Sequence, residues 1–202
     1  TLHERPGPGC KTAAVTFTLR VDGPAWRQHT ESVRDSLRPA IRGDGGLARL
    51  GDLVPVAKGN GYGLGLARLA AEATRLGVDR LAVGTVFEIA AVAPHFHGDI
   101  LVMSPWDPRD AVAEQQWQAL AATDHAHRII RTVSDMATVK SLPDALPPGT
   151  TRLVIEGITS MRRFGVLETD LLAVMGTAGF QRALADNRIR LEGLALHLPL
   201  AM

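Results

Sequence analysis

The chain has 202 residues, but only one cysteine and one tyrosine, and aromatic residues make up 4% of it. Cys10 has no second cysteine for an internal disulfide, which favours a reducing compartment. No uncharged apolar run reaches the roughly 18 residues of a membrane helix, and the N-terminal stretch lacks the apolar segment of a secretory signal. We therefore expect a cytoplasmic protein without a membrane partner.

An excess of charge of one sign is also missing. Lysine and arginine total 22, aspartate and glutamate total 21, and the formal net charge is +1. This balance gives no electrostatic footprint for nucleic acid, so we expect no nucleic-acid partner. The apolar share of 46% is ordinary for a soluble globular protein. A chain of this length buries about 70% of its unfolded surface, enough for a full core.

Strand-like and helix-like segments alternate along most of the chain. A flexible lead-in over 1–14 precedes an expected strand at 14–21 and a helix at 22–37. The later expected strands are 53–57, 80–84, 99–104, 128–133, 151–157 and 190–198, and the helices between them are 66–76, 87–93, 111–122, 134–142 (capped by Ser134) and 169–185 (with a glycine break). The strands are continuously apolar, which is typical of parallel strands covered by helices. A doubly wound sheet and a (β/α)8 barrel both fit; six βα-type strands are present, and a barrel needs eight.

The segment 54–65 reads VPVAKGNGYGLG and places Lys58 at the end of an apolar strand. The carboxyl ends of parallel strands are where such folds place chemistry. Burial there would lower the pKa of the lysine and make it nucleophilic, which suits a Schiff base with a flat aldehyde cofactor. The glycines would let the backbone approach that cofactor, and Tyr62 could reach an anionic group. The alternative is a solvated lysine before an ordinary glycine-rich turn.

Three motifs, in order, resemble the alanine racemase family. VAKGNGYGLG is similar to its pyridoxal-phosphate (PLP) lysine motif, RLVIEGITSMRRFGV (152–166) to its fifth-strand segment, and LEGLALHL (191–198) to its sixth. The segment LRVDGPAWRQH is similar to the opening strand and helix of the family. The resemblance implies an incomplete TIM (β/α)8-type barrel over residues 15–202, with about six of the eight βα units.

The resemblance also implies roles for four residues. Lys58 matches the lysine that holds PLP and serves as one of two acid/base groups at the substrate Cα. Tyr62 matches the tyrosine that binds the PLP phosphate. Arg163 matches the arginine near the cofactor oxygen and the substrate carboxylate, and His197 matches the histidine that packs on the pyridine ring. Lys58 and Arg163 are thus the expected catalytic residues, and Lys58, Tyr62 and His197 the expected cofactor-binding residues.

Several positions depart from the family pattern. Leu64 stands where a histidine is common, and 158–160 read Ile-Thr-Ser instead of Asp-Thr-Gly. Glu156 stands where many members have a lysine that can be carbamylated, and its carboxylate could orient Arg163 instead. These departures concern the substrate more than the cofactor.

The family takes its second base from a tyrosine in a C-terminal domain of the partner subunit, whereas Tyr62 is the only tyrosine here. The chain also lacks the seventh and eighth strands. We therefore expect an N-terminal portion of a PLP-dependent racemase of small amino acids, most simply alanine, that is homodimeric at full length and supports D-amino-acid and cell-wall precursor metabolism. Little or no turnover is expected from this portion alone. Two alternatives stay open: a non-catalytic PLP-binding barrel, and a PLP-dependent decarboxylase of the same barrel type.

Weaker signals are given structural interpretations. His95 and His97 lack third and fourth ligands nearby, so no metal site is expected. Trp117 is expected in the core, and Trp106 either lines the pocket or caps the strand structurally. Asp107 and Asp110 are expected to be helix-start residues.

Overall fold

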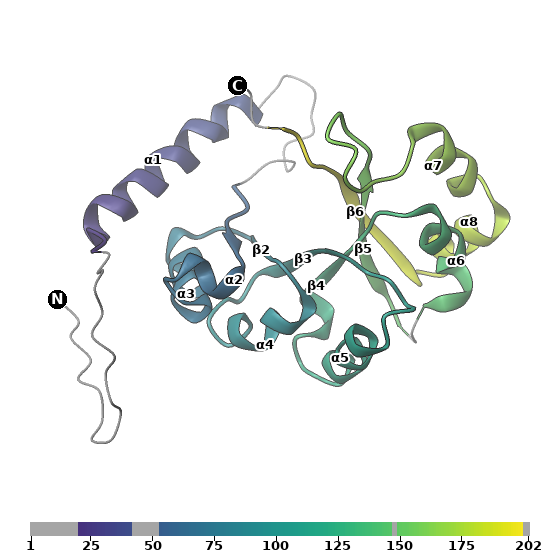
Figure 1. Cartoon of the computed structure of the whole chain (residues 1–202), viewed down its shortest axis with the longest axis horizontal. Helices are drawn as coiled ribbons and strands as arrows, with labels where there is room; N and C mark the ends of the chain where they lie inside the picture. The colour runs from purple at the N-terminus through teal and green to yellow at the C-terminus, as the bar shows by residue number, and fades with distance from the viewer. Residues whose placement is uncertain (1–19, 42–52, 147–148, 200–202) are drawn as a thin grey trace.

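The computed structural model describes residues 20–41, 53–146 and 149–199. Its centre is a sheet of six parallel strands in the order β1-β2-β3-β4-β5-β6 (Figure 1). The strands are β1 (Val56–Ala57), β2 (Arg80–Val83), β3 (Asp99–Pro105), β4 (Ile129–Val133), β5 (Thr151–Gly157) and β6 (Ile189–Leu196). Each strand pairs with the next in sequence, which is the order of a (β/α)8 barrel and not of a doubly wound sheet.

The helices that follow the strands cover one face of the sheet. Figure 1 shows them on the outer, convex side of an open arc, while no helix of the described residues lies on the concave side. They are α3 (Leu66–Leu76), η1 (Val86–Glu88) with α4 (Ile89–Val92), α5 (Ala111–Ala121), η2 (Ala126–Arg128), α6 (Met136–Ala145), α7 (Glu168–Met175) and α8 (Ala178–Ala185). A doubly wound sheet would carry helices on both faces, so the incomplete barrel is confirmed.

The hydrophobic core lies between the convex face and these helices. Val83, Ile100 and Ile155 from the strands are fully buried, as are Ile89 and Phe180 from the helices. Successive residues of a strand point to opposite faces. The residues that alternate with these core positions therefore face the concave side.

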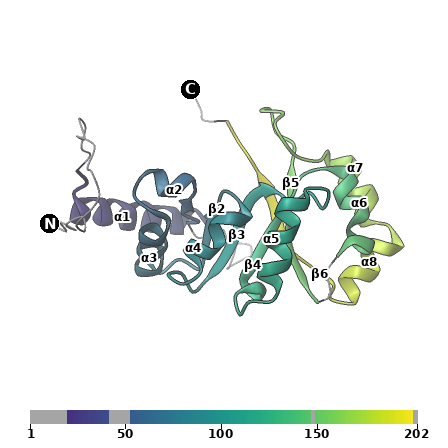
Figure 2. The ribbon, with the colours of Figure 1, turned by 60° about the horizontal axis from the view of Figure 1, so that its bottom comes forward.

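The first helix, α1 (Gly23–Ile41), begins at Asp22, whose carboxylate accepts a hydrogen bond from the Ala25 amide at 3.0 Å. It runs alongside α3 (Figure 2), and ion pairs join the two helices. Arg27 pairs with Glu72, and Glu31 pairs with Arg75. None of the helices in the described ranges is long and apolar enough to cross a membrane.

Sequence patterns located most elements closely. The helix at 66–76 and the strand at 151–157 have the expected limits, and the expected break in the last helix falls at 176–177. Asp110 caps α5 as expected, but Ser134 does not cap α6. Asp135 does, because its carboxylate accepts from the Thr138 amide at 2.8 Å, while the buried Ser134 carbonyl accepts from a distant loop. The expected strand at 14–21 lies almost wholly outside the described residues.

Four charged residues form a network on the concave face at the amino ends of the strands. Arg152 on β5 donates to both oxygens of Asp99 on β3, each at 2.6 Å, and to Glu192 on β6 at 2.6 Å. Arg80 on β2 lies 3.5 Å from Asp99 and 3.3 Å from Glu192. Burial acts to raise the pKa of Asp99, but its bonds to Arg152 and Arg80 outweigh burial and hold that pKa below its ordinary value. The network thus joins four strands at the end of the sheet away from Lys58.

We expect Asp99→Asn to lower the free energy of unfolding at neutral pH by about 2 kcal/mol, because it leaves the guanidinium of Arg152 with one carboxylate fewer. A depressed carboxyl pKa contributes stability above the unfolded-state value and loses it as pH falls. The difference between wild type and variant should therefore shrink below about pH 4. Urea unfolding across this pH range measures it.

Asp107→Asn is the matched control, since Asp107 pairs with the well-exposed Arg109. Exposed pairs contribute little, so this variant should change stability by about 0.5 kcal/mol or less. Equal losses in the two variants, or a loss in Asp99→Asn that does not depend on pH, would contradict the role assigned to the network.

Candidate active site

The four predicted site residues lie beyond the carboxyl ends of three strands. Lys58 directly follows β1, and Tyr62 ends the next turn. Arg163 lies in the loop after β5, and His197 directly follows β6. This is the end of a parallel sheet at which barrel folds place their functional side chains.

The backbone after Lys58 forms one left-handed turn, α2 (Gly59–Tyr62). All four residues have φ between +55° and +62°. The amides of Gly61 and Tyr62 donate to the Lys58 carbonyl at 3.0 and 3.3 Å and close the turn. Glycine adopts this conformation freely and asparagine adopts it more readily than most residues. The sequence GNGY is therefore suited to a left-handed turn, which most other residues disfavour. Tyr62 also adopts a positive φ, and this costs conformational energy.

Lys58 itself is exposed, so the expectation that this side chain is buried is wrong. The physical reason is the open arc: β1 pairs only with β2, and no other strand of the described residues pairs with its second edge. Tyr62 is also exposed, at 64%. The lysine and the phenol therefore stand on an accessible loop surface.

A single carboxylate fixes the loop that carries Lys58. Glu88 accepts from the Gly59 amide at 2.7 Å through Oε1, and from the amides of Gly84 and Thr85 at 2.6 and 3.0 Å through Oε2. It thereby ties the end of β1 to the end of β2. A Cβ added to Gly84 would lie 3.0 Å from the Lys58 Cβ and 2.9 Å from Glu88 Oε2, so glycine is required there for this approach. The start of the lysine side chain is thus held by backbone contacts.

A second group gathers beyond β5 and β6. Glu156, near the end of β5, is buried on the concave side, and burial raises its pKa above the ordinary value. His197 and Arg163 act on the same carboxyl and lower its pKa, in the opposite direction to burial. The hydroxyl of Thr159 donates to the His197 carbonyl at 2.6 Å and joins the two strand ends.

The loop that carries Arg163 returns to the sheet at Gly165. The Gly165 amide donates to the Ser134 carbonyl at 3.1 Å, beyond β4, and φ at Gly165 is 124°. A Cβ there would lie 2.4 Å from the Ile158 nitrogen, so only glycine permits the return. The glycine two residues after Arg163 is therefore explained by packing, and Arg163 stands exposed at the tip, over the ring of Phe164.

The structure thus brings the predicted residues together as two pairs. Lys58 and Tyr62 share the β1 loop, and His197 and Arg163 both act electrostatically on Glu156. In the described ranges no hydrogen bond or ion pair joins one pair to the other. The residues fit the cofactor that the resemblance implies: Cβ atoms added at Gly59, Gly63 and Gly65 would meet nothing within 4 Å, so this loop presents open backbone beside an amine.

Sequence reasoning missed Glu88, although a signal for it existed. Thr85 and Glu88 form a capping box, in which a threonine at the N-cap is followed three residues later by glutamate. That motif predicts bonds within the start of a helix. It does not predict the additional bond from Gly59, which depends on the neighbouring strand.

We expect Glu88→Gln to free the Gly59 amide selectively. One glutamine oxygen can still accept from Gly84 and Thr85, but the amide nitrogen then faces the Gly59 N–H and cannot accept from it. A bond to a charged acceptor contributes about 1.5–3 kcal/mol, so Gly59 amide exchange should speed up by a factor of roughly 10 to 100. Glu88→Ala should expose all three amides.

Hydrogen exchange followed by NMR measures each amide separately. Glu168→Gln is the control, because Glu168 is exposed in the first turn of α7. If Gly59 exchanges at the wild-type rate in Glu88→Ala, then Glu88 does not hold the loop.

Comparison with known proteins gives a consistent family. The family model described as "Alanine racemase, N-terminal domain" matches residues 45–202. No match was found among curated proteins. Among solved structures, the alanine racemase of Streptomyces lavendulae is similar at 23% identity and a TM-score of 0.62, over 87% of this chain and 41% of that one.

Two further structures extend the similarity. The alanine racemase of Bartonella henselae, with covalently bound pyridoxal phosphate, has 15% identity and a TM-score of 0.60, over 86% of this chain and 45% of that one. A histidine racemase from Leuconostoc mesenteroides has 21% identity and a TM-score of 0.56, over 72% of this chain and 36% of that one. These identities support the fold alone, and the chain spans less than half of the length of these structures.

Proposed function

The chain belongs to the family of alanine racemase N-terminal domains, and we propose that it binds pyridoxal 5′-phosphate through Lys58 as part of a racemase that acts on a small amino acid. The observation that carries this proposal is the Lys58 loop: an accessible amine at a strand end, fixed by Glu88 and followed by a left-handed, glycine-rich turn. Such a turn presents backbone to a flat ligand without side chains between them.

Each pair of site residues has a separate role in this proposal. Lys58 supplies the amine that binds the cofactor aldehyde and later holds or moves the proton at the substrate Cα. The phenol O–H of Tyr62 donates a hydrogen bond to the cofactor phosphate. Arg163 binds the substrate carboxylate, and His197 packs against the cofactor ring. When bound, the cofactor withdraws electrons from Cα and makes its proton acidic.

Glu156 supports this reading because it lies where Arg163 and His197 act on one carboxyl. A carboxylate beside a guanidinium fixes the direction of its N–H groups. We propose that Glu156 orients Arg163 toward the substrate. The identity of the amino acid follows from the family most simply as alanine, with the cell-wall precursor pathway and a homodimeric full-length protein as further expectations.

The covalent step can be tested directly, since the sequence has only three lysines, Lys11, Lys58 and Lys140. We expect PLP mixed with the chain to give a visible absorption band, and borohydride reduction to fix the label on Lys58. Peptide mass spectrometry locates the label. Lys140→Ala, at an exposed position on α6, should label as wild type does, whereas Lys58→Ala should lose the specific label.

Labelling spread equally over the three lysines would show only the ordinary reactivity of amines and would refute the cofactor role of Lys58. Retention of the band in Lys58→Ala would do the same.

Turnover separates a racemase from a non-catalytic PLP-binding barrel. Exchange on both faces of Cα needs a second acid/base group, and the one tyrosine already lies in the cofactor loop. We therefore expect these 202 residues with PLP and L-alanine in D₂O to form little or no deuterated D-alanine, as followed by chiral chromatography and mass spectrometry. Racemisation at the rate of an intact racemase would contradict this assignment of the missing group.

A further inference from the structure

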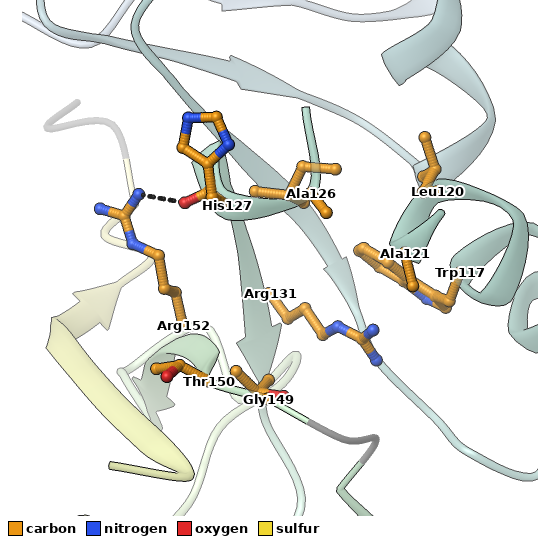
Figure 3. A pocket seen from close by; sticks show the side chains of 11 residues that line it. Trp117, Leu120, Ala121, Ala126, His127, Arg131, Gly149, Thr150 and Arg152 are labelled. Atoms are coloured by element: carbon orange, nitrogen blue, oxygen red, sulfur yellow. Dashed lines mark hydrogen bonds between the residues drawn. The ribbon is translucent and has the colours of Figure 1, made fainter. Parts of the chain in front are cut away.

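A cavity of about 240 Å³ lies between β4, β5 and α5 at the amino ends of the strands, away from Lys58. Figure 3 shows the Arg131 side chain extending from β4 toward Trp117 of α5, with Gly149 and Thr150 below the strand. Its walls carry both polar and apolar side chains. Apolar contributions come from Leu120, Ala126 and Ile129.

The charged group of this cavity is a buried guanidinium without a partner. Arg131 is 8% exposed, and its side chain makes no hydrogen bond or ion pair in the described part of the chain. Nη1 is fully buried and unpaired. The guanidinium lies between two indole rings, 4.7 Å from the centroid of Trp106 and 4.3 Å from that of Trp117.

The aromatic contacts stabilise the cation but do not satisfy it. Aromatic faces attract a cation through their quadrupole, yet they accept none of the five N–H bonds that arginine offers in a plane. Burial lowers the pKa of Arg131 to about 10, so the group remains charged at neutral pH. Glu114 acts on it at longer range, but its carboxylate accepts from the Trp106 indole at 3.1 Å. Buried charges are normally paired, and here the protein supplies no paired anion.

Neighbouring groups offer further polar contacts. Thr151 is buried in the cavity wall, and its hydroxyl has no hydrogen-bond partner in the described ranges. Thr150 and His127 stand at the exposed rim. Arg152 also borders the cavity, but its guanidinium is already bound by Asp99, Glu192 and the His127 carbonyl. Arg131 is therefore the guanidinium available to a ligand.

We propose that this cavity binds a small organic monocarboxylate, whose carboxylate accepts from Arg131 and Thr151 and whose short apolar body lies against Leu120 and Ile129. A single cation matches a single negative charge, and a phosphate dianion would need more donors than this wall presents. The apolar side chains of the lining suit a hydrocarbon group and would leave a bare inorganic ion only partly contacted. The site is separate from Lys58 and independent of the function proposed for it.

The test uses benzoate as the probe, with benzamide as its uncharged analogue and inorganic phosphate as the competing anion. Calorimetry gives the affinities, and the indole N–H signals in NMR give the location. Trp106 and Trp117 flank the site, whereas Trp26 lies on α1. We expect saturable benzoate binding that shifts the two flanking indoles and not Trp26, and that is about tenfold or more tighter than benzamide binding.

Variants then assign the contacts. Arg131→Met keeps an unbranched apolar side chain between the two rings, and it should weaken benzoate binding about tenfold or more. Arg182→Met is the matched control, since Arg182 is exposed on α8, and it should bind as wild type does. If Arg131→Met fails to fold, Thr151→Val is the deciding variant, and its benzoate affinity should be lower by about threefold or more.

Four results would overturn the proposal. They are the absence of saturable benzoate binding, equal affinity for benzamide, tighter binding of phosphate than of benzoate, and wild-type affinity in both Arg131→Met and Thr151→Val.

Discussion

The structure depends on the burial of one face of a parallel sheet. Residues such as Val83, Ile100 and Ile155 pack against helices on the convex side, and each helix must return the chain to the same edge before the next strand begins. The helices that follow the described strands lie on one side, the strands follow in sequence order, and the sheet curves. Every strand then ends at the same rim, so residues from β1, β5 and β6 become candidates for one site although they are far apart in the chain.

At that rim, backbone hydrogen bonds and backbone conformation fix the positions of the functional residues more than side-chain packing does. Lys58 is exposed, yet the chain on either side of it is fixed: the β1 end is tied to β2 through Glu88, and the following turn is left-handed. The arginine loop is similarly held through Gly165. Both loops present their functional residues from positions where a Cβ on a specific glycine would collide with neighbouring atoms. Gly84 and Gly165 thus mark close contacts, whereas Gly59, Gly63 and Gly65 have positive φ and open space around them.

Most of the fold could be predicted from the sequence, because apolar periodicity is local. The limits of the helix at 66–76 and of the strand at 151–157 depend on apolar spacing and on flanking glycine, and both were right. The cap of α6 was assigned one residue early, since Ser134 and Asp135 are adjacent residues of types that both favour the cap, and the sequence does not distinguish them. The expected burial of Lys58 was wrong because Lys58 follows β1, which is an edge strand of the open sheet in the described residues. The roles of Glu88 and Arg131 depend on neighbours across the sheet, which spacing alone does not specify.

The two ends of the concave face differ in whether their charged side chains are paired. This difference distinguishes residues that stabilise the fold from residues that are candidates for chemistry. At the amino ends, Arg80, Asp99, Arg152 and Glu192 pair with one another, and Arg190 also pairs with Glu192. At the carboxyl ends, Glu156 is buried with a raised pKa, and the cationic groups near it are exposed. A saturated network has no capacity left for a ligand, whereas an exposed guanidinium beside a buried carboxyl retains donors for one. Whether a guanidinium still has unbonded donors also distinguishes Arg152 from Arg131. Arg152 is bonded by Asp99, Glu192 and the His127 carbonyl and is structural, whereas Arg131 is buried with its donors unused.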